Sequence, residues 1–336
     1  MGVIRLKNAP SIVGYAAVVG KKEYEGPIGA DFDLHDETDT FGMDTWERSE
    51  SEMQRIALNL ALSRATLSGE DIDAIFAGDL LNQCTGSAYG MLGFSKPYFG
   101  LYGACSTFAE GTILSALTVN AGYFHRCAAV SSSHFCSAER QFRFPLEYGG
   151  QRAPTAQWTA TAAGSFIIAA EGDGPYITEV LPGTIVDKGI NDINNMGAAM
   201  APAAIDTLTA YFTETGKKPD DFDMILTGDL GKEGHGITLS LMKENGYDMT
   251  RVYNDCGLLL YGGDSQDVHC GGSGCGCSAS VICGHILKRF ARGELKNVLY
   301  LATGALMSPG RIKQGASIPG IAHLVRLSAD KNCQEG

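Results

Sequence analysis

Two cysteines open segments of the same kind in this sequence. Cys105 lies in "GACSTFAEGTILSA" (103–116), where a tight turn leads into a small-residue run of helical length. Unpaired backbone N–H groups and the positive end of the helix dipole favour the thiolate of a cysteine at such a position. An ordinary thiol, with a pKa of about 8.5, is only a few per cent ionised at neutral pH. Cys105 is therefore a candidate nucleophile, and the alternative is a small residue that fills a crowded turn.

An internal repeat gives Cys275 the equivalent position. The segment "DAIFAGDLLNQC" (73–84) matches "DMILTGDLGKEG" (223–234), and "GGSGCGCSAS" (271–280) matches the turn around Cys105. Each cysteine turn is followed by a predicted helix and strand at the same distance. We therefore expect two similar halves, residues 1–178 and 179–336.

Short apolar runs alternate with helical periodicity, which is typical of an α/β protein. We expect strands at 11–19, 72–79 and 126–136, two strands within 162–186, and an amphipathic helix over 47–65. Functional groups gather at the carboxyl ends of strands in open α/β sheets. The residues at such positions are Asp79, Ser131, Ser132, Ser133, His134, Asp229, His235 and Thr303.

Composition limits the function classes. The 336-residue chain has a net charge of -12, which argues against a nucleic-acid surface or an anionic-membrane surface. It contains no apolar run long enough to span a membrane and no signal-peptide pattern at its start, so we expect a soluble protein. Its 10 cysteines are then expected to be reduced thiols without structural disulfides.

The chain from about residue 70 to 325 resembles the thiolase superfamily, specifically condensing enzymes of the ketoacyl synthase III type. The resemblance is carried by "GACSTFAEGTILSA", by residues 139–169 and by "GGSGCGCSAS". It implies a fold of two βαβαβ halves packed as a five-layered αβαβα sandwich, with the site between the halves. It also implies a homodimer, because members of this superfamily usually pair through a strand near the nucleophile.

The same resemblance points to an incomplete catalytic site. Such enzymes stabilise an enolate with two hydrogen-bond donors from the second half, His together with His or Asn. Here Asp229 and Cys275 occupy those positions, and a carboxylate repels an enolate while a thiol is a weak donor. We expect a non-catalytic protein. The alternative is an acyltransferase that uses Cys105, with His134 or with His235, placed in a glycine-rich loop, as the base.

More closely, the whole chain resembles a family of sporulation proteins from spore-forming bacteria. The shared segments are "AGDLLNQ" (77–83), "AERQFRFPLEYGGQ" (138–151), "MGAAMAPAAIDT" (196–207) and "GGSGCGCSA" (271–279). This resemblance implies binding of dipicolinic acid, or of its calcium chelate, for uptake into the developing spore. It implies membrane-protein partners from the same sporulation operon and a peripheral position at the inner spore membrane.

Dipicolinate is a flat dianion, so its pocket needs arginines, hydroxyls or helix N–H groups. The candidate ligand-binding residues are Cys105, Asp79, Ser132, Ser133, His134, Arg140, Arg143 and Asp229, and Arg152 lies in the same segment as the two other arginines. No resident cofactor is expected, although calcium that arrives with the ligand could face Asp79 or Asp229. The group His269, Cys270, Cys275, Cys277, Cys283 and His285 lacks the spacing of a zinc or iron–sulfur site, so we expect no metal there.

Overall fold

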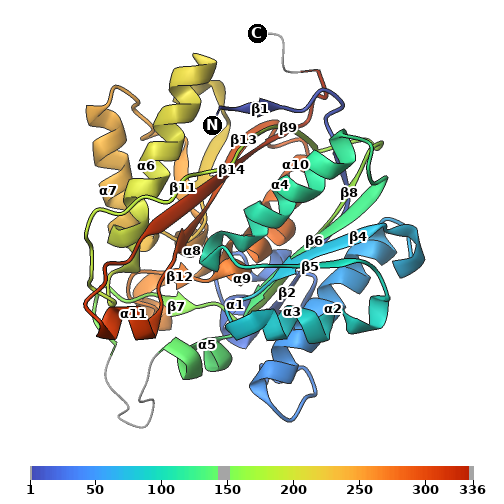
Figure 1. Cartoon of the computed structure of the whole chain (residues 1–336), viewed down its shortest axis with the longest axis horizontal. Helices are drawn as coiled ribbons and strands as arrows, with labels where there is room; N and C mark the ends of the chain where they lie inside the picture. The colour runs from blue at the N-terminus through green and yellow to red at the C-terminus, as the bar shows by residue number, and fades with distance from the viewer. Residues whose placement is uncertain (1, 143–151, 333–336) are drawn as a thin grey trace.

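A computed structural model describes residues 2–142 and 152–332 (Figure 1). The helices are α1 Lys21–Tyr24, α2 Trp46–Arg64, α3 Thr85–Gly90, α4 Thr107–Asn120, α5 Phe135–Phe142, α6 Met196–Thr215, α7 Gly231–Glu244, α8 Cys256–Leu260, α9 Cys275–Ser280, α10 Leu287–Ala291 and α11 Pro309–Lys313. The strands are β1 Ile4–Arg5, β2 Ser11–Gly20, β3 Leu34–Asp36, β4 Ala74–Gly78, β5 Tyr98–Leu101, β6 Arg126–Ser133, β7 Trp158–Thr159, β8 Ala162–Ala169, β9 Tyr176–Leu181, β10 Met224–Thr227, β11 Tyr253–Asp255, β12 Gly272–Ser273, β13 Asn297–Ala305 and β14 Gly320–Ser328.

The main sheet repeats one strand order in two halves of the chain. The first half runs β5-β4-β6-β8-β2 and the second runs β11-β10-β13-β14-β9. In each half the first three strands are parallel to one another. The fourth strand pairs antiparallel with the third, and the fifth pairs antiparallel with the fourth. A single pairing, Ser11 with Tyr176, links β2 to β9. The duplication predicted from the two cysteine segments is thus visible in the topology.

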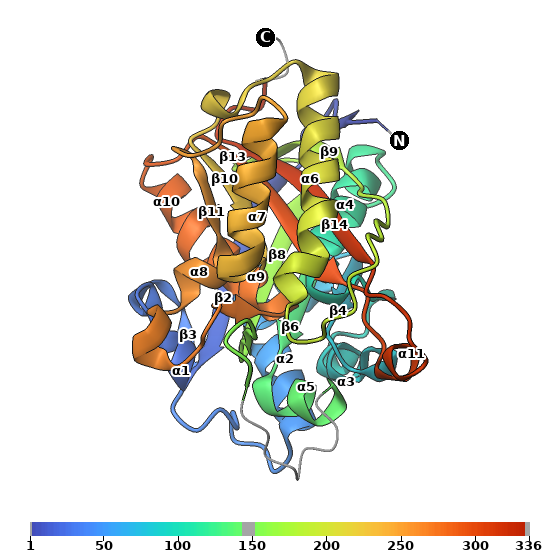
Figure 2. The same cartoon turned by 90° about the vertical axis from the view of Figure 1, so that its left-hand side faces the viewer.

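Helices cover both faces of each half-sheet, so the molecule has five layers. Helix α2 packs against β2, β6 and β8, and α6 packs against β13 and β14. Helices α6 and α7 form the outer layer on the second half (Figure 2). Helix α4 lies between the two half-sheets, in contact with β4, β6, β13 and β14, and α9 packs beside it. The expected αβαβα sandwich is confirmed.

The predicted elements of the first half occur close to their expected bounds. The strands expected at 11–19, 72–79 and 126–136 are β2, β4 and β6, the two expected within 162–186 are β8 and β9, and the helix expected over 47–65 is α2. The proposed division after residue 178 falls within β9, the strand that begins the second half at Tyr176. The division itself stays a prediction.

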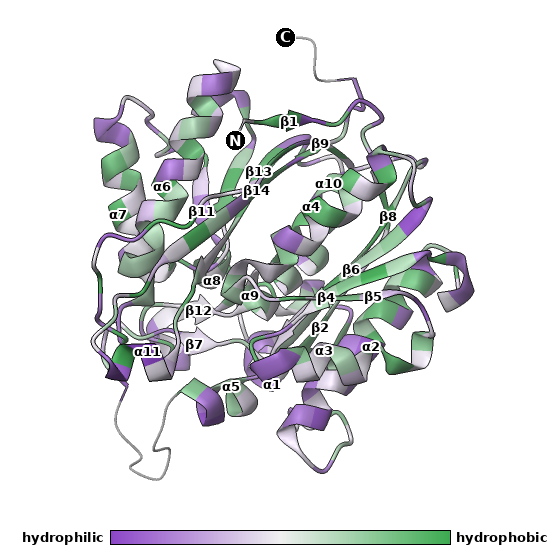
Figure 3. Cartoon of the chain, in the orientation of Figure 1, coloured by the Kyte–Doolittle hydropathy of each residue, from purple (hydrophilic) through white to green (hydrophobic). Residues whose placement is uncertain are grey.

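Hydrophobic residues concentrate on the strands, and helices α4, α6 and α7 each carry both hydrophobic and hydrophilic residues (Figure 3). The core between the layers includes Phe108 from α4 and Phe166 from β8, whose rings lie 4.7 Å apart. Within the described residues, no helix combines the length and apolar character needed to cross a bilayer. The nine described cysteines are free thiols.

Candidate functional site

Cys105 sits on a 3-10 turn, Ala104–Ser106, immediately before α4. The turn is held by the Gly103 carbonyl oxygen, which accepts hydrogen bonds from Ser106 N at 3.1 Å and from Ser106 Oγ at 2.6 Å. Ala104 has a φ of 52°, in the left-handed region that costs a residue with a Cβ on the order of 1 kcal/mol. Cys105 keeps part of its surface exposed. The turn therefore holds this thiol at an accessible place between the two halves.

The second half places Ser273 and Asp229 opposite this thiol. Cys105 Sγ lies 3.9 Å from Ser273 Oγ, and Ser273 Oγ donates to Asp229 Oδ2 at 3.1 Å. Ser273 thus connects the Cys105 thiol to the Asp229 carboxyl group. We call Cys105, Asp229 and Ser273 the Cys105 seat. The sequence analysis placed Cys105 and Asp229 in one site, and the structure places both beside Ser273. Ser273 itself was not predicted, because no local pattern distinguishes one serine in a glycine-rich turn.

Asp229 is fully buried and fully hydrogen-bonded. Its Oδ1 accepts from Thr303 Oγ1 at 2.9 Å, and its Oδ2 accepts from Gly274 N at 2.9 Å as well as from Ser273. Burial raises the pKa of this carboxyl group, and the hydrogen bonds oppose that rise. Because these groups present hydrogens to Asp229, the position holds an acceptor where a condensing enzyme needs a donor.

The pKa of the Cys105 thiol is raised well above its usual range. Loss of water around the thiol is the largest cause, and the nearby charge of Asp229 adds to it. Both causes oppose the thiolate that the start of the helix is expected to favour. A neutral thiol is the form that fits beside a buried carboxylate.

Cys275 begins α9 and is fully buried. Its thiol donates to the Ser132 carbonyl oxygen at 2.8 Å, and its side chain packs with Leu80, Ala138 and Cys105. Burial raises the pKa of Cys275 well above its usual range. The thiol hydrogen of Cys275 is thus donated to the protein itself and not to an enolate.

Asp79, at the end of β4, closes its own turn. Its Oδ1 accepts from Leu81 N at 2.8 Å, and its Oδ2 accepts from Ser87 N at 2.7 Å and from Ser87 Oγ at 2.6 Å. The residue is fully buried, and burial raises the pKa of its carboxyl group. Asp79 therefore has a structural role in this conformation and presents no exposed oxygen to a ligand.

Ser132 belongs to a buried polar network that the sequence prediction missed. Its hydroxyl donates to Glu50 Oε1 at 2.9 Å and accepts from Gln54 Nε2 at 2.7 Å. Glu50 also accepts from Ser137 Oγ at 2.7 Å, and burial raises the pKa of Glu50 to about 8. Glu50 and Gln54 precede Met53 and Ala57 by three residues each on α2. In the sequence, the sign of this network is a pair of polar residues within the apolar face of the predicted helix.

The side chains of His134 and Ser133 also form their hydrogen bonds within the protein. His134 Nδ1 accepts from Cys136 N at 3.2 Å, so Nε2 carries the proton that is donated to the Asp39 carbonyl oxygen at 2.9 Å. Burial lowers the pKa of this histidine. Ser133 Oγ donates to the Ala160 carbonyl oxygen at 2.7 Å. In this conformation both ring nitrogens are occupied, so His134 has no free nitrogen to act as a base.

His235 does not lie in a loop that returns to Cys105. It is in the first half of α7, and its ring stacks on Tyr253 with centroids 4.4 Å apart. One of the glycines beside it, Gly234, serves helix packing, since a Cβ there would lie 2.6 Å from the Gly197 carbonyl oxygen of α6. The glycine-rich appearance of 231–236 thus marks a close contact between α6 and α7, and the expected loop is wrong.

The described candidate arginines, Arg140 and Arg152, have different surroundings in the structure. Arg140 is 56% exposed and pairs with Glu47 at 2.9 Å on the surface, while Arg143 lies outside the described residues. Arg152 is largely buried and contacts Asp267 at 3.1 Å. Arg140 therefore has a surface partner in place of the expected ligand.

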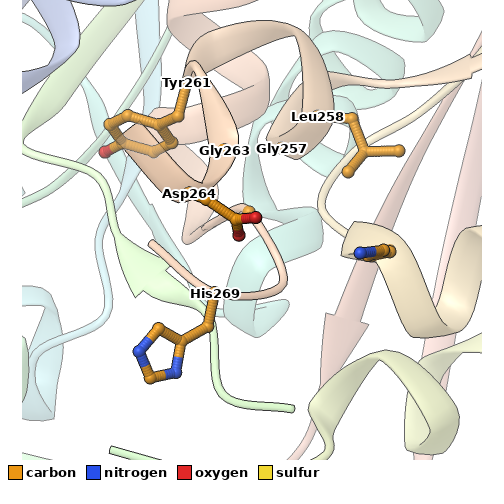
Figure 4. Close-up of a pocket in the computed structure, with 8 residues that line it drawn as sticks. Gly257, Leu258, Tyr261, Gly263, Asp264 and His269 are labelled. Atoms are coloured by element: carbon orange, nitrogen blue, oxygen red, sulfur yellow. The ribbon is translucent and has the colours of Figure 1, made fainter. Parts of the chain in front are cut away.

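A pocket of about 180 Å³ opens beside α8 and the segment that follows it (Figure 4). Its lining comprises Lys232, Gly257, Leu258, Tyr261, Gly263, Asp264, His269 and Gly271. None of the described candidate residues lines this pocket. Along the described chain, no three His, Cys, Asp or Glu side chains converge as metal ligands. His285, for example, pairs with Asp31 at 2.6 Å, and Cys283 donates to the Ser165 carbonyl oxygen.

Solved structures show the same fold. The 3-oxoacyl-[acyl-carrier-protein] synthase III of Aquifex aeolicus VF5 superposes with a TM-score of 0.55 at 14% identity, covering 94% of this chain and 99% of that chain. Cerulenin-bound OleA of Xanthomonas campestris superposes with a TM-score of 0.60 at 15% identity, covering 95% and 96% of the two chains. At this level of identity the likeness establishes the thiolase-like fold, as the resemblance implied.

Two sequence comparisons establish the family. The family model described as stage V sporulation protein AD matches residues 2–328. Stage V sporulation protein AD of Bacillus subtilis (strain 168) is 43% identical over 304 residues, which is 90% of each chain. The duplicated halves, the cysteine at the start of α4 and the comparisons agree, and the chain belongs to the stage V sporulation protein AD family, a group with a role in spore formation.

Proposed function

We propose that this protein is a non-catalytic binding protein of spore formation, which takes up dipicolinic acid or its calcium chelate in the former condensing-enzyme cleft at the Cys105 seat. The observation that carries the proposal is that Cys105 lies beside Ser273, which donates to the buried carboxyl group of Asp229. Burial and the charge of Asp229 both raise the pKa of the Cys105 thiol, so these surroundings favour its neutral form. Such a seat supports binding better than nucleophilic attack.

The positions of the candidate bases support the same conclusion. His134 uses both ring nitrogens on backbone groups, and His235 stacks against Tyr253 in α7. Cys275 directs its hydrogen to the Ser132 carbonyl oxygen. A condensing reaction at Cys105 would need a base and two enolate donors, and these residues have other partners.

Isothermal titration calorimetry tests the proposal. Dipicolinate, with and without equimolar calcium, is titrated into the wild-type protein and into Cys105→Ala. We expect saturable binding by the wild type and a change in affinity in the variant. Absence of binding by the wild type under both conditions would refute the proposal.

A ketoacyl-synthase-like acyltransferase is the second candidate, favoured by the partial exposure of Cys105 at the start of a helix. It predicts an acyl mass increment on Cys105 after incubation with acyl-CoA. An unchanged intact mass across several acyl-CoA chain lengths would remove this candidate. Covalent labelling that disappears in Cys105→Ala would instead replace the binding proposal.

We also propose that the protein is a homodimer that pairs through β5. This strand lies at the end of the first half-sheet, where its backbone has an unpaired side. Phe99 and Tyr102 are each 45% exposed along this edge, and Leu92 and Tyr89 nearby are 74% and 71% exposed. Light scattering after size-exclusion chromatography is expected to give a dimer mass. Phe99→Arg is expected to shift it to the monomer, and a monomeric wild type would contradict the proposal.

The proposal of membrane partners rests on the resemblance described in the sequence analysis and not on a surface of this structure. We propose that membrane proteins of the same sporulation operon hold the protein at the inner membrane of the developing spore. Co-purification of the tagged protein with those partners from sporulating cells tests this. Recovery of the tagged protein free of them would count against it.

A further inference from the structure

Helix α5 forms one wall around the Cys105 side chain. Its residue Ala138 belongs to an apolar cluster with Leu80 and Cys275. The side chain of Cys105 packs against this cluster, and so does the ring of Phe142, the last residue of α5. Helix α5 therefore borders the seat at which the proposed ligand binds.

The first turn of α5 is held by a buried hydrogen bond and by ring stacking. Ser137 Oγ donates to Glu50 Oε2 of α2 at 2.7 Å, and both residues are buried. Phe135, the first residue of the helix, stacks on Trp158 of β7 with ring centroids 3.8 Å apart and planes 8° apart. Figure 2 shows α5 beside α2 at the lower end of the molecule. This turn of the helix is therefore anchored to both α2 and β7.

The last turn of α5 is held by the amide side chain of Gln141. Gln141 Nε2 donates to the Leu80 carbonyl oxygen at 3.0 Å, and Gln141 Oε1 accepts from Asn82 N at 2.9 Å. Both backbone groups belong to the turn after β4, which Asp79 closes with hydrogen bonds of its own. One side chain thus joins the end of α5 to a turn that is fixed independently of it.

These two attachments differ in how readily they release. The Gln141 hydrogen bonds lie at or near the surface, where water can replace either partner. The hydrogen bond between Ser137 and Glu50 is buried, and breaking it leaves buried polar groups without partners. The last turn of α5 is therefore the end that opens, and Phe142 leaves the apolar cluster when it does.

We propose that Gln141 is the positioning residue that closes α5 over the Cys105 seat, and that the last turn of α5 opens to admit the ligand. The helix rotates about its first turn, which Ser137 and Phe135 hold in place. This inference rests on the proposed function, because it gives the same ligand its route of entry to the same seat.

Alkylation of Cys105 by two reagents of different size tests this inference. Iodoacetamide and the bulkier 5-iodoacetamidofluorescein carry the same reactive group, so a change in the pKa of the thiol alters both rates by the same factor. A change in access alters the rate of the bulkier reagent more. We expect Gln141→Ala to speed its reaction about tenfold, as the loss of hydrogen bonds does, and to speed that of iodoacetamide less. Mass spectrometry of the Cys105 peptide measures both rates at pH 8.

Glu47→Gln is the matched control. It removes the ion pair between Glu47 of α2 and Arg140, the neighbour of Gln141 on α5. Because an exposed ion pair contributes little to stability, both alkylation rates should stay within twofold of those of the wild type. Gln141→Leu, which keeps most of the side-chain volume and loses both hydrogen bonds, should behave as Gln141→Ala does. Labelling of the fully buried Cys275 and thermal unfolding, measured on each variant, report on folding.

The fluorescence of Trp158 tests whether the first turn stays in place. The chain contains two tryptophans, so Trp46→Phe leaves Trp158, which stacks on Phe135, as the sole tryptophan. On this background we expect Gln141→Ala to leave the emission of Trp158 unchanged. A shifted emission would show that the whole helix moves and would overturn the rotation about the first turn.

The outcomes separate this inference from the proposed function. Equal acceleration with both reagents, or none, would overturn the role of Gln141 whether or not dipicolinate binds. Concurrent labelling of Cys275 would also overturn it, because the substitution would then loosen the whole cluster. If only the bulkier reagent gains strongly, but dipicolinate neither protects Cys105 nor gives a heat of binding, the proposed function fails while the closing of α5 by Gln141 stands.

Discussion

The starts of α4 and α9 place equivalent cysteines in opposite environments. Cys105 is partly exposed and faces a carboxyl group of the other half, Asp229. Cys275 is fully buried and donates to the backbone of the other half, at Ser132. We call Cys275, Ser132 and Glu50, which accepts from the Ser132 hydroxyl, the Cys275 seat. The same backbone duplication thus carries one seat whose cysteine is partly exposed and one whose cysteine is fully buried.

The strand-end aspartates follow the same division. Asp229 uses its oxygens on Thr303, Gly274 and Ser273, which gather around the Cys105 seat. Asp79, its counterpart in the other "GDL" segment, uses its oxygens on its own turn. A duplicated fold therefore fixes where chemistry-bearing residues lie, and side-chain partners decide which of the two seats remains available.

The largest expected contrast between the seats comes from adding one methyl group to each. A Cβ on Gly276 would lie 2.1 Å from the Ala162 carbonyl oxygen, a backbone atom that cannot rotate away. A Cβ on Gly103 would meet Ser106 Oγ at 2.6 Å and Glu110 Oε2 at 2.8 Å, which are side-chain ends. We expect Gly276→Ala to lower the free energy of unfolding by about 3 kcal/mol and Gly103→Ala by about 1 kcal/mol or less. Urea titration measures both, and equal losses would show that the two seats are equally rigid.

The buried acids of the Cys275 seat give the next effect, as a pH dependence of stability. Burial raises the pKa of Glu50 to about 8 in the folded protein, and its unfolded pKa is the ordinary 4.5. Between these two pKa values, Glu50 is mostly ionised in the unfolded state and mostly protonated in the folded state. The unfolded state therefore binds fewer protons than the folded state. The free energy of unfolding should therefore fall as the pH rises from about 4.5 toward 8 and level off above it.

One carboxyl group contributes a slope of at most about 1.4 kcal/mol per pH unit in that window. Glu50→Gln should reduce the slope by close to this amount while keeping the acceptor for Ser132. Urea titrations at several pH values provide the measurement, with Glu52→Gln as the control, because Glu52 lies on the same helix but is partly exposed and paired with Arg55. A slope that Glu50→Gln leaves intact would mean that other buried acids carry the dependence.

The Cys105 seat should respond to a change of charge. Because Asp229 helps to raise the pKa of Cys105, Asp229→Asn should lower that pKa and speed alkylation of the thiol by iodoacetamide at pH 8. A fall of one pKa unit gives about a tenfold faster reaction. Mass spectrometry of the Cys105 peptide measures the rate. Asp79→Asn is the matched control, and an equal acceleration there would point to general loosening of the fold.

Much of this arrangement could be predicted from the sequence because the repeat is explicit. The matching "GDL" segments and the two cysteine turns identified the duplicated topology, and the resemblance to condensing enzymes placed Asp229 in the same site as Cys105. Contacts between distant segments were not predictable from the local pattern. The glycines around His235 suggested a loop, whereas Gly234 allows α7 to approach Gly197 of α6. Likewise, only the folded chain shows that Ser132 takes its partners Glu50 and Gln54 from α2.

The smallest contrast is the removal of each sulfur atom. Cys275→Ala opens a space in a fully buried cluster with Leu80 and Ala138, whereas Cys105→Ala shortens a side chain that already contacts solvent. We expect a loss of about 1 kcal/mol in the free energy of unfolding for Cys275→Ala and about half of that or less for Cys105→Ala. If only the Cys105 seat binds the ligand, dipicolinate should raise the melting temperatures of the wild type and of Cys275→Ala by the same amount. A ligand-induced shift that survives in Cys105→Ala and vanishes in Cys275→Ala would assign the ligand to the other seat.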